Sequence, residues 1–188
     1  DDNFAQISVN TSAAEYVTNT FGHKHGQWIG IAPFAKKKSN MLPYRTTKEL
    51  IRRLSSRQHT HIFLFGAGEV ECEMLRQWSA MNNNITCIAG RLELEQELEL
   101  MRQLDFIVCM DSANQHLASL VGLRAISIWC ATHPHMGFYG YRQRKEDCIQ
   151  HAISCRPCTI HGRTQCKYLN FLCQQISVDE IENRLCIQ

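Results

Sequence analysis

Five short apolar runs constrain the fold of this chain more than any other feature of its sequence. Each run is four or five residues long, and the five lie at 28–32, 61–65, 85–88, 106–110 and 125–129. Runs of this length are too short for typical helices, and their apolar residues are continuous rather than alternating. Strands with this pattern are buried on both faces, as in a parallel sheet covered by helices.

Segments with helical periodicity separate these runs. Apolar residues recur at three- and four-residue intervals, as at Val70, Met74 and Trp78, which predicts helices packed by one face. Ser177 and Glu180 have the spacing of a capping box. The helices are expected at 13–21, about 47–54, 70–81, 94–104, 114–121 and 178–186. This alternation predicts an α/β fold, a Rossmann-like doubly wound parallel sheet.

The expected domain organisation has two parts. Residues 1–26 are polar and weakly patterned and are interpreted as a lead-in or linker. Residues 27–188 are predicted to form one Rossmann-like domain, which includes a cysteine-rich tail at about 148–175 and a C-terminal helix. A chain of 188 residues is long enough for one such domain with its own hydrophobic core.

Composition argues against several classes of protein. The formal net charge of +2 is too small to indicate a nucleic-acid partner, and no apolar window is long enough to span a membrane. The ten cysteines are not evenly spread, as they are in secreted disulfide scaffolds. They favour a reducing, cytoplasmic setting.

The segment after the fourth predicted strand is a candidate binding site. Ligands of open parallel sheets bind beyond the carboxyl ends of the strands. Here Asp111 and Ser112 begin a predicted helix, whose free N–H groups favour an anion such as a diphosphate, and His116 lies one turn further on. Alternatively, Asp111 or Ser112 is an ordinary N-cap and His116 a half-buried histidine. The three residue types together at this edge favour a site.

Two other loops at the same edge carry weaker signals. Gly66 and Gly68 begin like a dinucleotide fingerprint, but Glu71 stands where the third glycine is required, so a nicotinamide cofactor is disfavoured. This loop is either a tight turn or a place where Glu69 or Glu71 meets sugar hydroxyls. The lysines at 36–38 are either a solvated face or a set of phosphate-binding cations.

Four stretches resemble one known family. They are IAPFAKKKSNMLP, FLFGAGEVE, the long stretch from AGRLELEQ through DFIVCMDSANQHLASLVGLRAISIWCATHP, and the cysteine-rich ending that begins ISCRPC. Their order and motifs are similar to those of the glycosyltransferase family that contains the bacterial ADP-heptose:lipopolysaccharide heptosyltransferases. The resemblance runs from about residue 28 to residue 181.

The resemblance implies a two-domain enzyme of the GT-B type, of which this chain is the C-terminal, donor-binding half. It implies transfer of a heptose-like sugar from an ADP-type nucleotide donor to a lipopolysaccharide core acceptor, without a redox cofactor. The general base of the family is an Asp in an N-terminal domain, so the isolated chain is expected to be inactive. The expected location is the cytoplasm of a bacterium, with at most peripheral contact with the inner face of the cytoplasmic membrane.

The resemblance also assigns roles to residues. Asp111, Ser112 and His116 fall on the family's donor-binding motif, with Ala113 in place of its usual glycine, and Asn40 stands where the family usually has a phosphate-binding lysine. Both departures leave open a rival interpretation, a non-catalytic module that binds a nucleotide or a partner. The full set of expected donor-binding residues is Ala35, Lys36, Lys38, Glu69, Leu92, Asp111, Ser112, Ala113 and His116.

Four cysteines near the C-terminus suggest a structural site. Cys155, Cys158, Cys166 and Cys173 have a spacing with one close pair and two single residues. Four thiolates can hold a structural zinc ion, although a second close pair would be the more typical pattern. The alternatives are free thiols packed under the domain or a disulfide.

Overall fold

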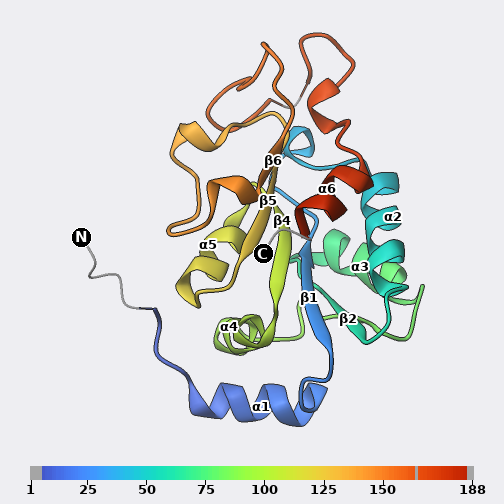
Figure 1. Ribbon diagram of the computed structural model, residues 1–188, viewed down its shortest axis with the longest axis vertical. Coiled ribbons are helices and arrows are strands. Elements are labelled where there is room, and N and C mark those ends of the chain that lie inside the picture. Colours follow the sequence, from blue (N-terminus) through green and yellow to red (C-terminus); the bar gives the residue numbers. More distant parts are fainter. Residues whose placement is uncertain (1–5, 164, 186–188) are drawn as a thin grey trace.

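The computed structural model describes residues 6–163 and 165–185, and its centre is a six-stranded parallel sheet (Figure 1). The strand order is β3-β2-β1-β4-β5-β6, and every neighbouring pair is parallel. The strands are β1 (Gln27–Ala32), β2 (Thr60–Leu64), β3 (Ile85–Cys87), β4 (Phe106–Met110), β5 (Ala125–Trp129) and β6 (Cys148–Gln150). This is the order of the doubly wound dinucleotide-binding fold, so the Rossmann-like prediction is confirmed.

Helices cover both faces of the sheet (Figure 1). Helices α2 (Tyr44–Ser55), α3 (Glu69–Ser79) and α6 (Val178–Leu185) pack on one face, and α1 (Thr11–Phe21), α4 (Leu94–Gln103) and α5 (Ala113–Leu120) pack on the other. Side chains of the strands alternate between the two faces: Ile29 and Ile31 join the first core, whereas Trp28 and Ala32 join the second. Burial on both faces explains why the strands have continuous apolar sequences.

All five expected strands are present, and the sequence missed the sixth. Strand β6 is only three residues long and pairs with β5 from Ser127 to Trp129, so Ile149 is its single fully apolar core residue. A strand of that length carries no periodicity that sequence patterning can detect. The predicted end of the last helix at Cys186 lies outside the described residues.

The first helix packs on the domain. Val17 of α1 is completely buried in the core that α4 and α5 share, and Asn10 caps α1 by accepting a hydrogen bond from the Ala13 N–H. The Asn10 N–H donates to the Glu99 carboxylate on α4 at 2.9 Å. Residues 10–21 therefore lie against the sheet's helical layer (Figure 1).

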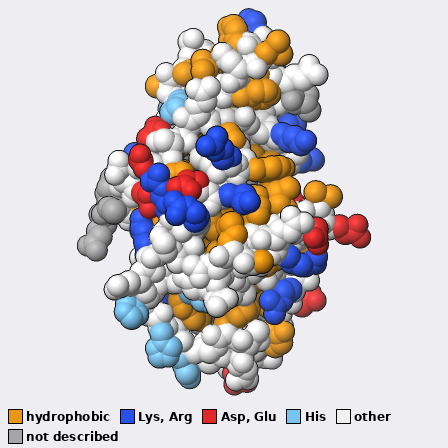
Figure 2. Space-filling model, turned by 90° about the vertical axis from the view of Figure 1, so that its right-hand side faces the viewer, with side chains coloured by type: hydrophobic (Ala, Val, Ile, Leu, Met, Phe, Trp, Pro, Cys, Tyr) orange, Lys and Arg blue, Asp and Glu red, His pale blue; other side chains and the backbone are white. Residues whose placement is uncertain are grey.

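Ion pairs hold the last helix in place. Arg53 of α2 contacts Asp179 and Glu182 of α6 at 2.5 and 3.0 Å, and Arg57 contacts Glu182 at 2.8 Å. Acidic and basic side chains are mixed on this face of the molecule (Figure 2). No helix in residues 6–163 and 165–185 is long and apolar enough to cross a membrane.

Candidate functional site

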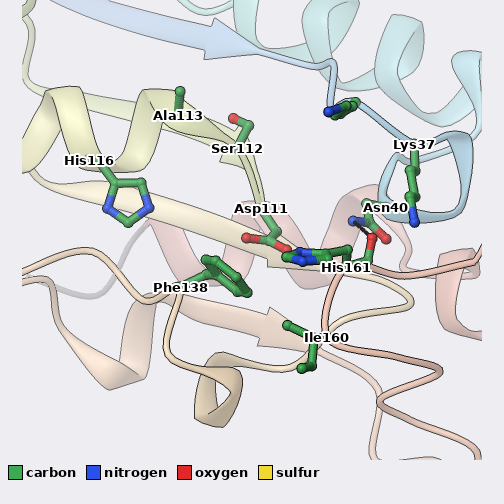
Figure 3. Close-up of a pocket in the computed structure, with 10 residues that line it drawn as sticks. Lys37, Asn40, Asp111, Ser112, Ala113, His116, Phe138, Ile160 and His161 are labelled. Atoms are coloured by element: carbon green, nitrogen blue, oxygen red, sulfur yellow. Dashed lines mark hydrogen bonds between the residues drawn. The ribbon is translucent and has the colours of Figure 1, made fainter.

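A cavity of about 480 Å³ lies at the carboxyl edge of the sheet, and we call it the histidine cavity (Figure 3). Segments that follow β1, β4 and β5 contribute to it, together with a loop of the cysteine-rich segment. Its lining residues are Lys36, Lys37, Asn40, Asp111, Ser112, Ala113, His116, Phe138, Ile160 and His161. The edge is the one where parallel sheets bind ligands.

The N-terminus of α5 opens into this cavity. Ser112 is the N-cap residue, but its side chain makes no capping hydrogen bond, and its Oγ is buried without a partner among the described residues. The first N–H groups of a helix have no partner within the helix. The α5 N-terminus therefore presents free backbone donors and one free hydroxyl, which suits an anion.

Asp111 is held in a fixed orientation beside these donors. Its carboxylate accepts a hydrogen bond from Gln115 Nε2 at 3.3 Å, and Gln115 Oε1 accepts one from the Gly140 N–H at 3.2 Å. Gln115 is fully buried, so it ties the end of β4 to the loop after β5. Burial raises the pKa of the Asp111 carboxyl, while the nearby His116 and His161 oppose that shift.

Lys36 is the cation that remains available to a ligand. It is exposed, lines the histidine cavity and forms no ion pair within the part of the chain that the structure describes. Lys37 differs, because its Nζ donates to the Gly162 carbonyl at 2.8 Å. Lys38 lines another cavity, beside Pro43 and Tyr44, so it does not join this site.

A second cavity of about 400 Å³ adjoins the first, and we call it the glutamate cavity. The two share Lys36, Asp111, Ser112 and Ala113. The glutamate cavity is further lined by Phe34, Ala35, Phe65, Gly66, Ala67, Glu71, Glu97, Asn114 and Leu117. It combines apolar walls with three carboxyl groups, those of Glu71, Glu97 and the shared Asp111, and adjoins the histidine cavity at the α5 N-terminus.

The two glutamates of this cavity have different environments. Glu71 Oε2 accepts a hydrogen bond from the Ala67 N–H at 3.1 Å, which shapes the turn after β2. Burial raises the pKa of Glu97 to about 7. Loss of hydration disfavours the charged form of an acid, so Glu97 is protonated in a large share of molecules near neutral pH.

The structure brings together most of the residues expected from the sequence. Asp111, Ser112, Ala113, His116 and Lys36 line the histidine cavity, and Ala35 lines the glutamate cavity. Glu69 and Leu92 line neither cavity: Glu69 is exposed at the start of α3, and Leu92 is partly buried against the hydrophobic core.

Sequence reasoning missed several lining residues. His161, Ile160 and Phe138 come from loops without periodic patterning, about 25 to 50 positions after Asp111, and only tertiary folding brings them to it. Glu97 was hidden within a Glu-rich helical pattern. Glu71 was named as an alternative to Glu69, and only Glu71 lines a cavity.

The four cysteines do not form a metal site in this structure. Cys155, Cys158 and Cys166 line a cavity of about 230 Å³, while Cys173 is buried in the core. Within residues 6–163 and 165–185, no group of three or more His, Cys, Asp or Glu side chains is arranged to hold a metal ion. Burial raises the pKa of the Cys158 thiol and raises that of Cys173 to about 11, whereas backbone hydrogen bonds lower the pKa of Cys166.

The fold and the site define a Rossmann-like domain in which a helix N-terminus borders a cavity at the carboxyl edge of the sheet. The family model of glycosyltransferase family 9 (heptosyltransferase) matches residues 2–169, and the chain belongs to this family.

Solved structures of similar fold agree with this membership. The Escherichia coli ADP-heptose lps heptosyltransferase II has a TM-score of 0.73 at 20% identity, over 96% of this chain and 52% of its own. A glycosyl transferase family 9 protein from Veillonella parvula has a TM-score of 0.76 at 13% identity, over 98% and 53%. E. coli heptosyltransferase WaaC with ADP-2-deoxy-2-fluoro heptose has a TM-score of 0.64 at 14% identity, over 96% of this chain and 49% of its own.

This chain therefore spans about half the length of the solved structures it matches. No curated protein matches it in sequence.

Proposed function

We propose that this chain binds the nucleotide-sugar donor of a glycosyltransferase reaction and is the C-terminal, donor-binding half of a two-domain enzyme. The observation that carries this proposal is the α5 N-terminus, where the Ser112 hydroxyl, which has no hydrogen-bond partner among the described residues, lies at a cavity lined by Lys36, His116 and His161. Free N–H groups, a hydroxyl, an ammonium and imidazoles are the donors that a diphosphate requires.

The two adjoining cavities suit the two parts of such a donor. A diphosphate in the histidine cavity would lie beside Lys36, which also borders the glutamate cavity. The glutamate cavity offers apolar walls such as Phe34 and Leu117 to a base, and the Glu71 and Glu97 carboxyl groups to ribose hydroxyls. This division supports a nucleoside diphosphate sugar, and the solved relative WaaC with ADP-2-deoxy-2-fluoro heptose supports the ADP type.

The proposed chemistry is transfer of a heptose-like sugar to a lipopolysaccharide core acceptor. The bond between the anomeric carbon and the diphosphate oxygen breaks, and the leaving diphosphate gains negative charge. Donors fixed before the reaction stabilise such charge most effectively, which assigns this role to the α5 N–H groups, Lys36 and His116. The base that takes the acceptor proton belongs, in this proposal, to an N-terminal domain. The enzyme would act in the cytoplasm, at most peripherally bound to the membrane.

Calorimetric titration of the chain with ADP, UDP, GDP and NAD tests the proposal. We expect ADP to bind most tightly and NAD not to bind. If none of the nucleotides binds, the proposal fails and the rival function, a non-catalytic partner-binding module, is favoured. The Asn40 and Ala113 departures are the sequence features that support that rival.

A His116→Ala variant tests the site within an active enzyme. In the protein that contains this chain together with its acceptor-binding partner domain, we expect turnover to fall roughly a hundredfold, the usual effect of removing one fixed donor to developing charge. Turnover equal to that of the unmodified protein would contradict the role of His116.

A structural zinc ion held by the four cysteines remains a separate hypothesis. Only their spacing supports it. Elemental analysis of protein purified without chelator decides the matter: one zinc per chain would support the hypothesis, and no metal would remove it.

A further inference from the structure

The loop at residues 159–162 forms one side of the histidine cavity, and we call it the loop wall (Figure 3). It belongs to the cysteine-rich segment and contributes Ile160 and His161 to the lining. The start of this loop is fixed next to β5, because the Cys158 N–H donates to the Ala131 carbonyl at 2.9 Å. A segment that sequence reasoning treats only as a tail therefore completes the cavity.

Two polar residues that follow β1 hold the loop wall in place. Lys37 Nζ donates to the Gly162 carbonyl, and Asn40 Nδ2 donates to the His161 carbonyl at 3.2 Å. The Thr159 hydroxyl also donates to the Gly162 carbonyl, at 2.9 Å. Lys37 and Asn40 line the cavity, but their polar atoms are engaged in these contacts.

Gly162 allows this close contact. Its φ of +75° is strained for any other residue, and a Cβ at this position would lie 2.1 Å from Asn40 Oδ1. The loop backbone consequently lies directly against the Asn40 side chain. The His161 imidazole, in contrast, makes no hydrogen bond within the part of the chain that the structure describes.

We infer that His161 binds the nucleotide-sugar donor. Its imidazole, which the loop wall carries, donates a hydrogen bond to a phosphate oxygen from the side opposite the N–H groups of α5. This inference rests on the proposed function. Its basis is that the Asn40 amide and the Lys37 ammonium fix the loop, while the imidazole lines the cavity beside Phe138, at 5.3 Å between ring centroids. Asn40 and Lys37 are then positioning residues for His161.

Charge near Asp111 strengthens this inference. A diphosphate at the α5 N-terminus lies close to the Asp111 carboxylate, and two anions at short distance repel each other. His116 and His161 both oppose the rise in pKa that burial causes in the Asp111 carboxyl. In its protonated form, an imidazole on each side would donate to the phosphate and offset the carboxylate.

Titration of ADP and adenosine into the chain tests the inference. We expect His161→Ala to weaken ADP binding about tenfold, the loss of one hydrogen bond to a charged group, and to leave adenosine binding unchanged. His161→Gln, which retains an N–H donor, should recover part of the loss. The matched control is His25→Ala, since His25 is exposed and precedes β1 at the opposite edge of the sheet.

The outcomes separate this inference from the proposed function. If the unmodified chain binds ADP and His161→Ala binds it equally well, the inference is overturned and the donor site stands. If the unmodified chain binds no nucleotide, the proposed function fails and the inference fails with it. Equal melting temperatures of the variants and the unmodified chain show that folding is intact.

A double-mutant cycle tests the positioning role of Asn40. We expect Asn40→Ala to weaken ADP binding because it releases the loop, and the double variant Asn40→Ala/His161→Ala to bind no more weakly than His161→Ala alone. Additive losses would show that Asn40 contacts the ligand independently and would overturn its positioning role.

Discussion

The two sides of the histidine cavity are built in different ways. The α5 side, with Asp111, Ser112 and His116, is a junction between a strand and a helix, and its backbone belongs to the regular fold. The loop wall is held by side chains that lie 121 and 125 positions away in sequence. The fold alone thus determines the first side, while the second depends on a few specific contacts, so the two sides should respond differently to substitution.

The largest expected effect is on the stability of the regular fold that carries the α5 side, at the edge of the sheet opposite the cavity. The Asp147 carboxylate is completely buried and accepts two hydrogen bonds from Arg124, at 2.8 and 2.6 Å, which joins the start of β5 to the turn before β6. Removing one partner of a buried ion pair leaves the other charge uncompensated. We expect Asp147→Ala to lower the free energy of unfolding by about 3 kcal/mol, measured by urea denaturation.

Two further variants complete this test. Asp179→Ala removes an exposed carboxylate that pairs with Arg53 and should cost about 0.5 kcal/mol. Lys37→Ala releases the loop wall and should cost about 1 kcal/mol or less. If Lys37→Ala destabilises the chain as much as Asp147→Ala does, the contrast between the two sides is wrong.

A smaller effect is expected at Ser112, where substitution should weaken ADP binding without lowering the stability of the chain. The Ser112 hydroxyl is buried and makes no hydrogen bond to residues 6–163 or 165–185, so Ser112→Ala should leave the melting temperature unchanged or raise it, while ADP affinity falls about fivefold. Scanning calorimetry and ADP titration measure the two quantities.

Ser119→Ala is the matched control on the same helix. The Ser119 hydroxyl donates to the Gln115 carbonyl at 2.9 Å, so its loss should lower stability by about 1 kcal/mol and leave ADP affinity unchanged. A Ser112→Ala variant that loses stability but not affinity would mean that this hydroxyl serves the fold rather than a ligand.

An effect that depends on pH is expected at Glu97. The folded-state pKa of about 7 lies above the ordinary value of 4.5, so between these values the folded chain binds more protons than the unfolded chain. The stability contributed by this group is therefore lost as pH rises towards and through 7. We expect Glu97→Gln to melt at a higher temperature than the unmodified chain at about pH 8, and the difference to shrink by about pH 5.

Glu95→Gln provides the comparison for this titration. Glu95 is exposed on the same helix, so Glu95→Gln removes the same charge from α4 outside the glutamate cavity. A melting difference for Glu97→Gln that does not vary with pH would exclude the raised pKa.

The contrast between the two sides also explains what the sequence predicted. Continuous apolar strands and helical periodicity are local patterns, so the parallel sheet and five of its six strands could be recognised. Because parallel strands end at one edge, the same patterns located Asp111, Ser112 and His116. The resemblance to the heptosyltransferases added the sugar and the transfer reaction.

Local patterns could not predict the loop wall. The contacts of Lys37 and Asn40 with residues 161 and 162 follow from tertiary folding, and no spacing in the sequence indicates them. The same reason explains why Lys36 and Lys38 were both expected at the site although, of these two, Lys36 lines the histidine cavity and Lys38 lines another cavity. Likewise, Glu71 rather than Glu69 lines the glutamate cavity, because neighbouring positions on a helix face different sides.

The most direct test of a diphosphate site at the α5 N-terminus is a residue-resolved titration of the chain with ADP by NMR, with adenosine as reference. Backbone amide signals at the α5 N-terminus, from Ser112 to Asn114, and at His161 should shift with ADP and remain in place with adenosine. ADP shifts confined to other parts of the chain, or identical shifts with the two compounds, would contradict a diphosphate site at this edge of the sheet.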